Sequence, residues 1–151
     1  MAGAMSEERK DLPTFGRGKY FLTRILFLRL LGLVYFVAFA VATTQNKALI
    51  GVDGITPFPT RLEHLLVQAQ NQRFKAFSEN PTLLWYMDWT DQNLLNLSRA
   101  GLALSLVPLL LGSCNGIILV SLWVLYTSIV NVGGTWYGFG WENMLLEVGF
   151  W

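Results

Sequence analysis

Three apolar runs of nearly 20 residues constrain the fold more than any other feature of this sequence. They cover residues 25–44, 94–111 and 117–133. A helix of about 20 residues, rising 1.5 Å per residue, crosses a hydrocarbon core of about 30 Å. The runs therefore predict an all-α, multi-pass transmembrane protein with three spanning helices. A further apolar stretch from about residue 141 predicts an interfacial helix or the start of a fourth span.

Composition supports the membrane class and excludes several functions. Only 14% of the residues are charged, against roughly 25% in an average soluble protein. The net charge of +1 excludes the basic stripe that binds nucleic acid. With one cysteine, Cys114, and one histidine, His64, neither an internal disulfide nor a Cys/His zinc site can form. We expect no metal and no cofactor.

The first run has two interpretations. Residues 1–19 are polar and predict a disordered tail. The run could be a cleaved signal peptide, because Ala40 and Ala42 resemble a cleavage site. Its length, its long leader and the internal Arg29 favour a retained helix, with the arginine extending to the headgroups.

The connection over residues 45–93 contains one amphipathic pattern. Leu62, Leu65, Leu66 and Ala69 recur at helical spacing and predict a helix over 60–77. Thr60 begins a Thr-x-x-Glu sequence that is typical of a capping box. The helix is too polar to span, so it lies on the membrane surface, packs on other helices or binds another protein.

Basic residues predict the orientation. Arg17, Lys19 and Arg24 precede the first run closely, whereas Lys47 and Arg61 lie near its other end. The positive-inside rule then puts the N-terminus and residues 112–116 in the cytosol, and residues 45–93 and 133–151 in the lumen or exterior. Unpaired Cys114 fits the reducing side.

This orientation brings two tryptophan-rich segments, PTLLWYMDWTDQN from Pro81 and GTWYGFGWEN from Gly134, to the same side. They form an aromatic belt at the headgroups, a structural cap over the helices or a docking surface. The candidate cluster consists of Trp85, Asp88, Trp89, Asp91, Trp136, Tyr137, Trp141, Glu142 and Glu147.

The acids in this cluster suggest no catalytic residue. Asp88 and Asp91 are three apart, so one helix face could carry both, or Asp91 could cap the helix and pair with Arg99. Glu147 enters an apolar stretch and is a functional candidate for that reason. No nucleophile–base pair or phosphate loop accompanies these acids.

Three stretches resemble the lipase maturation factor family of endoplasmic reticulum membrane proteins. They are YFLTRILFLRLLGLVYFVAFAVATTQNKALIGVDGITP, NPTLLWYMDWTD and LWVLYTSIVNVGGTWYGFGWENMLLEVGF, and they cover most of residues 20–150 in family order. The resemblance implies a protein that helps secreted lipases reach their active form and has no enzymatic activity of its own.

Family members continue into further spans and a large lumenal domain, so the resemblance implies that this chain is an N-terminal portion that serves as the membrane anchor region, a short product or a diverged protein. Binding of lipase clients is then a property of the longer protein. A fragment of a membrane enzyme or transporter, and a structural membrane subunit, are the alternatives. The intramembrane charges Arg29, Arg99, Glu142 and Glu147 are the basis of the first alternative.

Overall fold

The computed structural model describes residues 17–150, and that part of the chain consists of helices and their connections, without a strand. The tail predicted over residues 1–19 lies outside it, apart from the first residues of α1, as does Trp151. The predicted all-α, multi-pass membrane class is confirmed. The helices are α1 (Arg17–Ile50), α2 (Phe58–Gln68), α3 (Arg73–Glu79), η1 (Leu83–Tyr86), α4 (Asp91–Leu111), α5 (Gly116–Gly133), η2 (Gly134–Tyr137) and α6 (Trp141–Phe150).

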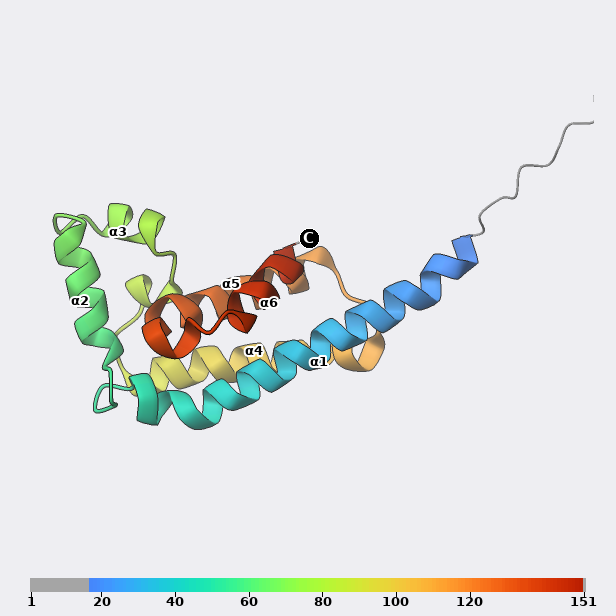
Figure 1. Cartoon of the computed structure of the whole chain (residues 1–151), viewed down its shortest axis with the longest axis horizontal. Coiled ribbons are helices and arrows are strands. Elements are labelled where there is room, and N and C mark those ends of the chain that lie inside the picture. Colours follow the sequence, from blue (N-terminus) through green and yellow to red (C-terminus); the bar gives the residue numbers. More distant parts are fainter. Residues whose placement is uncertain (1–16, 151) are drawn as a thin grey trace, which may run out of the picture.

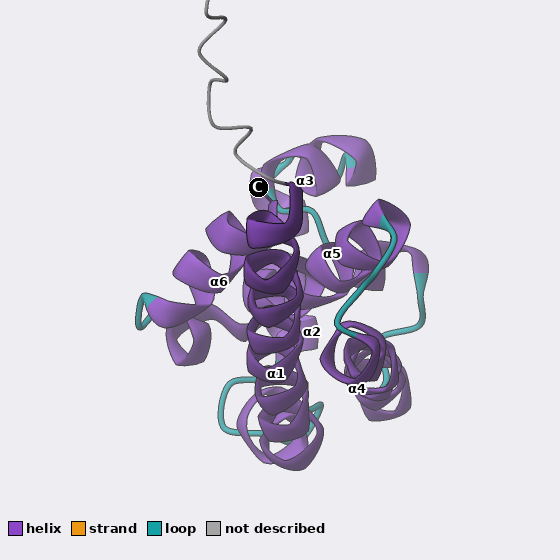
Figure 2. Cartoon of the chain, turned by 90° about the vertical axis from the view of Figure 1, so that its right-hand side faces the viewer, coloured by secondary structure: helices purple, strands orange, loops and turns teal. Residues whose placement is uncertain are grey.

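Three helices of the described chain are long and apolar enough to cross a membrane: Tyr20–Ile50, Asp91–Leu111 and Gly116–Tyr137. α1 and α4 run side by side, α5 returns along them, and α6 turns back along α5 (Figure 1). Seen from the end, α4 and α6 lie on opposite sides of α1 (Figure 2). α1 has 34 residues and is about 51 Å long, so it exceeds the run predicted over 25–44 at both ends.

Small residues allow α1 and α4 to pack closely. A Cβ on Gly32 would lie 2.7 Å from the backbone nitrogen of Leu109, and one on Gly101 would meet the ring of Phe39. Between α1 and α5, Tyr35 and Phe39 pack edge-on against Tyr126, with ring centroids 6.0 and 5.5 Å apart. Such packing holds membrane helices together, because lipid supplies no hydrophobic force between them.

The helix predicted over 60–77 is two helices, α2 and α3. Gln70 and Asn71 adopt φ of 57° and 60°, a left-handed conformation that ends helices and that asparagine tolerates. The Asn71 amide donates to the Leu66 carbonyl at 2.9 Å and closes the end of α2. The break turns the chain so that Ala69 and Ala76 are both buried in one cluster.

The predicted capping box at Thr60 is wrong. α2 begins two residues earlier, at Phe58, and its N-cap Pro57 makes no side-chain hydrogen bond to the helix. Phe58 is fully buried, so its packing in the core holds the first turn of α2 in place. Pro59 suits the first turn because an N–H there would have no helical partner.

Candidate functional site

The connections over residues 51–57, 80–90 and 134–140 lie at one end of the bundle, together with α2 and α3 (Figure 1). We call this the loop end. Eight of the nine candidate residues lie in or beside these connections. The exception is Glu147, which is farther along α6 and exposed.

The candidate aromatic residues fall into two groups. Trp85 and Trp89 pack edge-on with centroids 6.2 Å apart, in a core with Phe58, Leu62 and Leu84. Their indole N–H groups donate to the carbonyls of Asn80 and Leu84, at 3.1 and 3.0 Å. Both tryptophans therefore stabilise the loop: each ring packs in the core, and each indole N–H has a hydrogen-bond acceptor.

The second aromatic group surrounds Tyr126 of α5. Tyr137 and Trp141 each place a ring 6.4 Å from the Tyr126 ring. Nearby, the Trp136 indole donates to Thr56 Oγ1 at 2.8 Å, and the Tyr137 hydroxyl donates to Asn46 Oδ1. Residues 134–140 are therefore held to the 51–57 connection at Thr56 and to α1 at Asn46. Among the described residues, no ring of this group stacks on Trp85 or Trp89.

The two aspartates differ in role. The Val52 amide donates to Asp91 Oδ1 at 2.7 Å, so this carboxylate joins α4 to the loop after α1. The cap of α4 is Thr90, whose hydroxyl accepts from the Asn93 amide; the prediction that Asp91 caps the helix is wrong. Asp88 precedes α4 and does not share a helix face with Asp91.

Polar residues near the end of α5 hold the segment before η1. Thr82 Oγ1 donates to the Ser128 carbonyl at 3.0 Å, and the Leu83 amide donates to Ser128 Oγ at 3.1 Å. The Asn131 side-chain amide donates to the Pro81 carbonyl at 2.6 Å. A bond from Ser128 or Asn131 to a partner about 50 residues earlier leaves no local pattern in the sequence.

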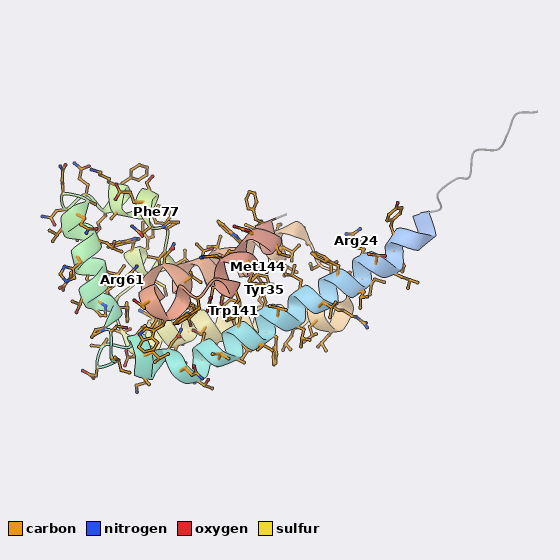
Figure 3. The ribbon with its side chains drawn as sticks, viewed as in Figure 1. Arg24, Tyr35, Arg61, Phe77, Trp141 and Met144 are labelled. Atoms are coloured by element: carbon orange, nitrogen blue, oxygen red, sulfur yellow. The ribbon has the colours of Figure 1, made fainter. Side chains whose placement is uncertain are left out.

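Glu142 is the most unusual of the candidate residues. Its side chain is 3% exposed, and its Oε2 has no hydrogen-bond partner in the described chain. It lines a cavity of about 70 Å³ that also contacts Asn46 and Tyr126. Asn46 Nδ2 and the Tyr126 hydroxyl are likewise buried without partners among residues 17–150. Trp141 also lines this cavity. Figure 3 shows Tyr35 and Trp141 between α1 and α6.

This cavity combines an orphaned acceptor, an orphaned donor and a hydroxyl that can act as either. A space of that volume suits one or two water-sized polar species. Glu142 is among the residues predicted from the sequence, whereas Asn46 and Tyr126 are not. Asn46 continues α1 beyond the predicted end of the first run, and Tyr126 looks like any aromatic residue of a span.

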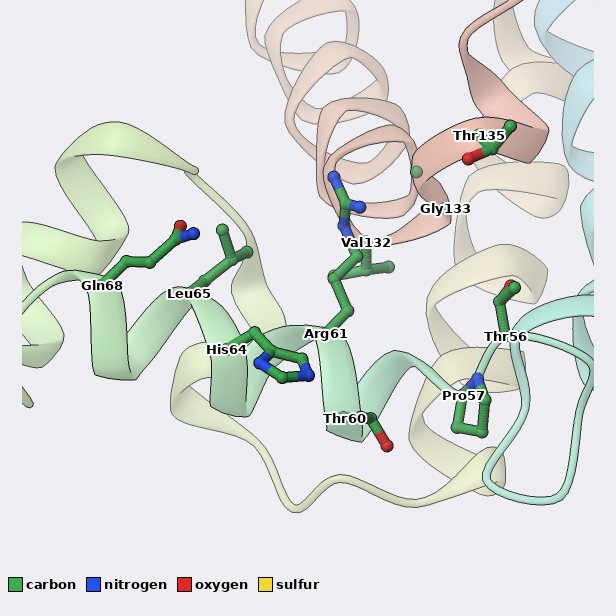
Figure 4. A pocket seen from close by; sticks show the side chains of 11 residues that line it. Thr56, Pro57, Thr60, Arg61, His64, Leu65, Gln68, Val132, Gly133 and Thr135 are labelled. Atoms are coloured by element: carbon green, nitrogen blue, oxygen red, sulfur yellow. The ribbon is translucent and has the colours of Figure 1, made fainter.

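A second hollow of about 520 Å³ opens between α2 and the end of α5 (Figure 4). Arg61 reaches across it and donates from Nε to the Asn131 carbonyl at 3.1 Å. His64 lies one turn further along α2. From the sequence, Arg61 was expected only to contribute to the charge balance that predicts the orientation. The remaining lining residues are Thr56, Pro57, Thr60, Leu65, Gln68, Val132, Gly133, Gly134 and Thr135.

The described residues contain no group of three or more His, Cys, Asp or Glu side chains placed to hold a metal ion. In the larger hollow, His64 shares the lining with Thr60 and Thr135, but no hydrogen bond among the described residues joins its imidazole to either hydroxyl. The arrangement at the loop end can bind and position other groups, and it offers no assembled catalytic site.

Comparison with known proteins gives a consistent result. The family model "Lipase maturation factor transmembrane domain" matches residues 22–151. Human lipase maturation factor 1 is 47% identical over 136 residues, which is 88% of this chain and 24% of the relative. The mouse protein is 46% identical over 97% of this chain and 26% of its own length. Human lipase maturation factor 2 is 36% identical over 85% of this chain and 18% of its own length.

No solved structure matches the chain. The chain spans about a quarter of the length of the lipase maturation factor 1 proteins that it matches. The family model covers most of the chain, including every residue of the candidate cluster. The chain therefore belongs to the lipase maturation factor transmembrane domain family.

Proposed function

We propose that this chain is the membrane anchor region of a protein that assists the folding and assembly of secreted lipases in the endoplasmic reticulum. The observation that carries the proposal is the family match over residues 22–151, together with relatives named lipase maturation factor 1 at up to 47% identity. The region acts as a scaffold and without catalysis.

The loop end is where such a scaffold would present a further domain or a client. In the proposed orientation the N-terminus is cytosolic and the loop end is lumenal. The exposed aromatic side chains at this end, Tyr86 and Phe139 among them, support a contact surface there. The indole N–H groups of Trp85, Trp89 and Trp136 are all hydrogen-bonded, which supports a rigid structural cap at this end.

Lipase secretion tests the division between anchor and client binding. Cells that lack their own maturation factor are given either this chain or a full-length relative, and active secreted lipase is measured. We expect the full-length relative to restore activity and this chain alone to leave it near background, although both reach the endoplasmic reticulum. Restoration by this chain alone would refute the anchor-only proposal. Failure of both proteins, with normal expression, would remove the lipase role altogether.

Topology has its own test at Cys114, in the connection opposite the loop end. Burial raises the pKa of the Cys114 thiol, and nearby Arg24 lowers it, so labelling is run at mildly alkaline pH to increase the thiolate fraction. In sealed microsomes an impermeant maleimide added outside should label Cys114. Protection that detergent removes would reverse the proposed orientation.

A further inference from the structure

The hollow between α2 and the end of α5 combines an arginine, an imidazole, hydroxyls and a position at the end of a span. Its polar lining includes Arg61, His64, Thr60, Thr135 and Gln68. No carboxylate is among its described lining residues. We propose that this hollow binds the phosphate headgroup of an anionic phospholipid. The site is independent of any role in lipase maturation.

Depth in the bilayer is the first argument. The last turn of α5 lines the hollow through Val132 and Gly133, and the candidate span that includes α5 ends at Tyr137. α2 runs across this end of the bundle rather than along it (Figure 1). The hollow therefore lies where the apolar part of the span gives way to the headgroup layer. Phospholipid phosphates are concentrated at that depth, next to the protein.

The geometry of Arg61 is the second argument. Its Nε is held by the Asn131 carbonyl at 3.1 Å, and its guanidinium lies against Gly134, where a Cβ would be 2.7 Å from Nη1. The anchored Nε fixes the guanidinium plane, so its terminal nitrogens are already ordered before a ligand binds. A fixed guanidinium offers paired N–H donors that match phosphate oxygens.

The surrounding groups complete a phosphate site. His64 follows Arg61 by three residues and therefore lies on the same face of α2. Thr60 of α2 and Thr135 of η2 also line the hollow (Figure 4). Val132 and Leu65 supply an apolar floor that suits the glycerol and first methylenes of a lipid. A volume of about 520 Å³ exceeds what a free phosphate needs.

The test measures retained lipid by native mass spectrometry. Protein purified in mild detergent is equilibrated with equimolar phosphatidylglycerol and phosphatidylcholine. We expect the unaltered protein to retain phosphatidylglycerol in preference to phosphatidylcholine. Arg61→Gln should weaken the preferred binding about tenfold, as expected for the loss of a charge-assisted hydrogen bond. Arg73→Gln removes the same charge from α3, outside the hollow, and should change nothing.

A second pair of variants covers the case in which Arg61→Gln fails to fold. Thr135 is exposed and lines the hollow, so Thr135→Glu places a negative charge there and should abolish the preference. Ser113→Glu adds the same charge at an exposed position in the opposite connection and should leave it intact. Helicity by circular dichroism and a single peak on gel filtration establish that each variant is folded.

Several outcomes would overturn the proposal. One is equal retention of both lipids by the unaltered protein. Another is an equal loss of phosphatidylglycerol in Arg61→Gln and Arg73→Gln, or in Thr135→Glu and Ser113→Glu. Complete displacement by millimolar inorganic phosphate would assign the site to free phosphate instead. Tighter binding of poly-glutamate than of phosphatidylglycerol would assign it to an acidic protein partner.

Discussion

Two arginines close the C-terminal ends of spanning helices, one at each end of the bundle. Arg29 of α1 donates to the Leu110 carbonyl of α4 at 3.4 Å, and Arg61 of α2 donates to the Asn131 carbonyl of α5. In each case the guanidinium lies against a glycine of positive φ, Gly112 at 63° or Gly134 at 55°. A cation there satisfies orphan carbonyls and offsets the negative helix end. Arg29 was predicted to extend to the headgroups, and its partner in α4 was not predicted.

Glu142 gives a prediction at the same scale. Its buried carboxylate lacks a hydrogen-bond partner in the described chain, so its charge costs stability. Glu142→Gln should raise the free energy of unfolding by about 1–3 kcal/mol, measured by thermal unfolding in detergent. Glu147→Gln is the control at an exposed position and should change stability by less than about 0.5 kcal/mol. A decrease in Glu142→Gln would mean that a bound cation or another counter-charge neutralises the carboxylate.

Between helices, the α1–α4 contact depends on small residues. Gly32 faces the backbone at Pro108 and Leu109, and backbone atoms cannot rotate away as side chains do. Pro108 lies inside α4 and is buried in this contact; membrane helices accept proline where neighbours support the backbone. The helix types were predictable from periodicity and run length. Which glycine carries the contact was not, because it depends on the partner helix.

Gly32→Ala tests this contact. The added methyl group would lie 2.7 Å from Leu109 N, so the helices must separate, and we expect a loss of about 1–3 kcal/mol in unfolding free energy. The control is Gly116→Ala in the first turn of α5, where nothing lies within 4 Å of the new Cβ; its stability should be unchanged or slightly raised. Both are measured by thermal unfolding in the same detergent. Equal midpoints for the two variants would contradict the assigned packing.

Across the whole molecule, stability is unevenly distributed. One buried core joins α1, α4, α5, η2 and α6, and a second, at the loop end, joins α2, α3 and η1 to the ends of α1 and α5 and the start of α4. α3 has seven residues and buries only Ala76, and Phe74 is 81% exposed. Short helices with little burial open easily. We infer that α3 is the least stable helix outside the spans.

Hydrogen–deuterium exchange in nanodiscs checks this inference. Amides of α3 (Arg73–Glu79) should exchange at least about a hundredfold faster than those in the middle of α4, because α4 is both packed and shielded by lipid. The internal control is α2, which buries Phe58 and Leu62 and should exchange more slowly than α3. Protection of α3 equal to that of α4 would mean that α3 is covered by lipid or by another protein.

The sequence by itself determined the three spanning helices of the described residues, the all-α membrane class and the family. Run length and hydropathy are local properties, and the segment from Gly134 contains a local motif that resembles the family. Only the tertiary structure decided how the loop end is built: the division of the helix over 60–77, the two separate aromatic groups, the burial of Glu142, and the partners of Asp91 and Arg61. Those partners lie tens of residues away. Most buried polar groups need a matching donor or acceptor from the fold, and no local pattern records which distant residue supplies it.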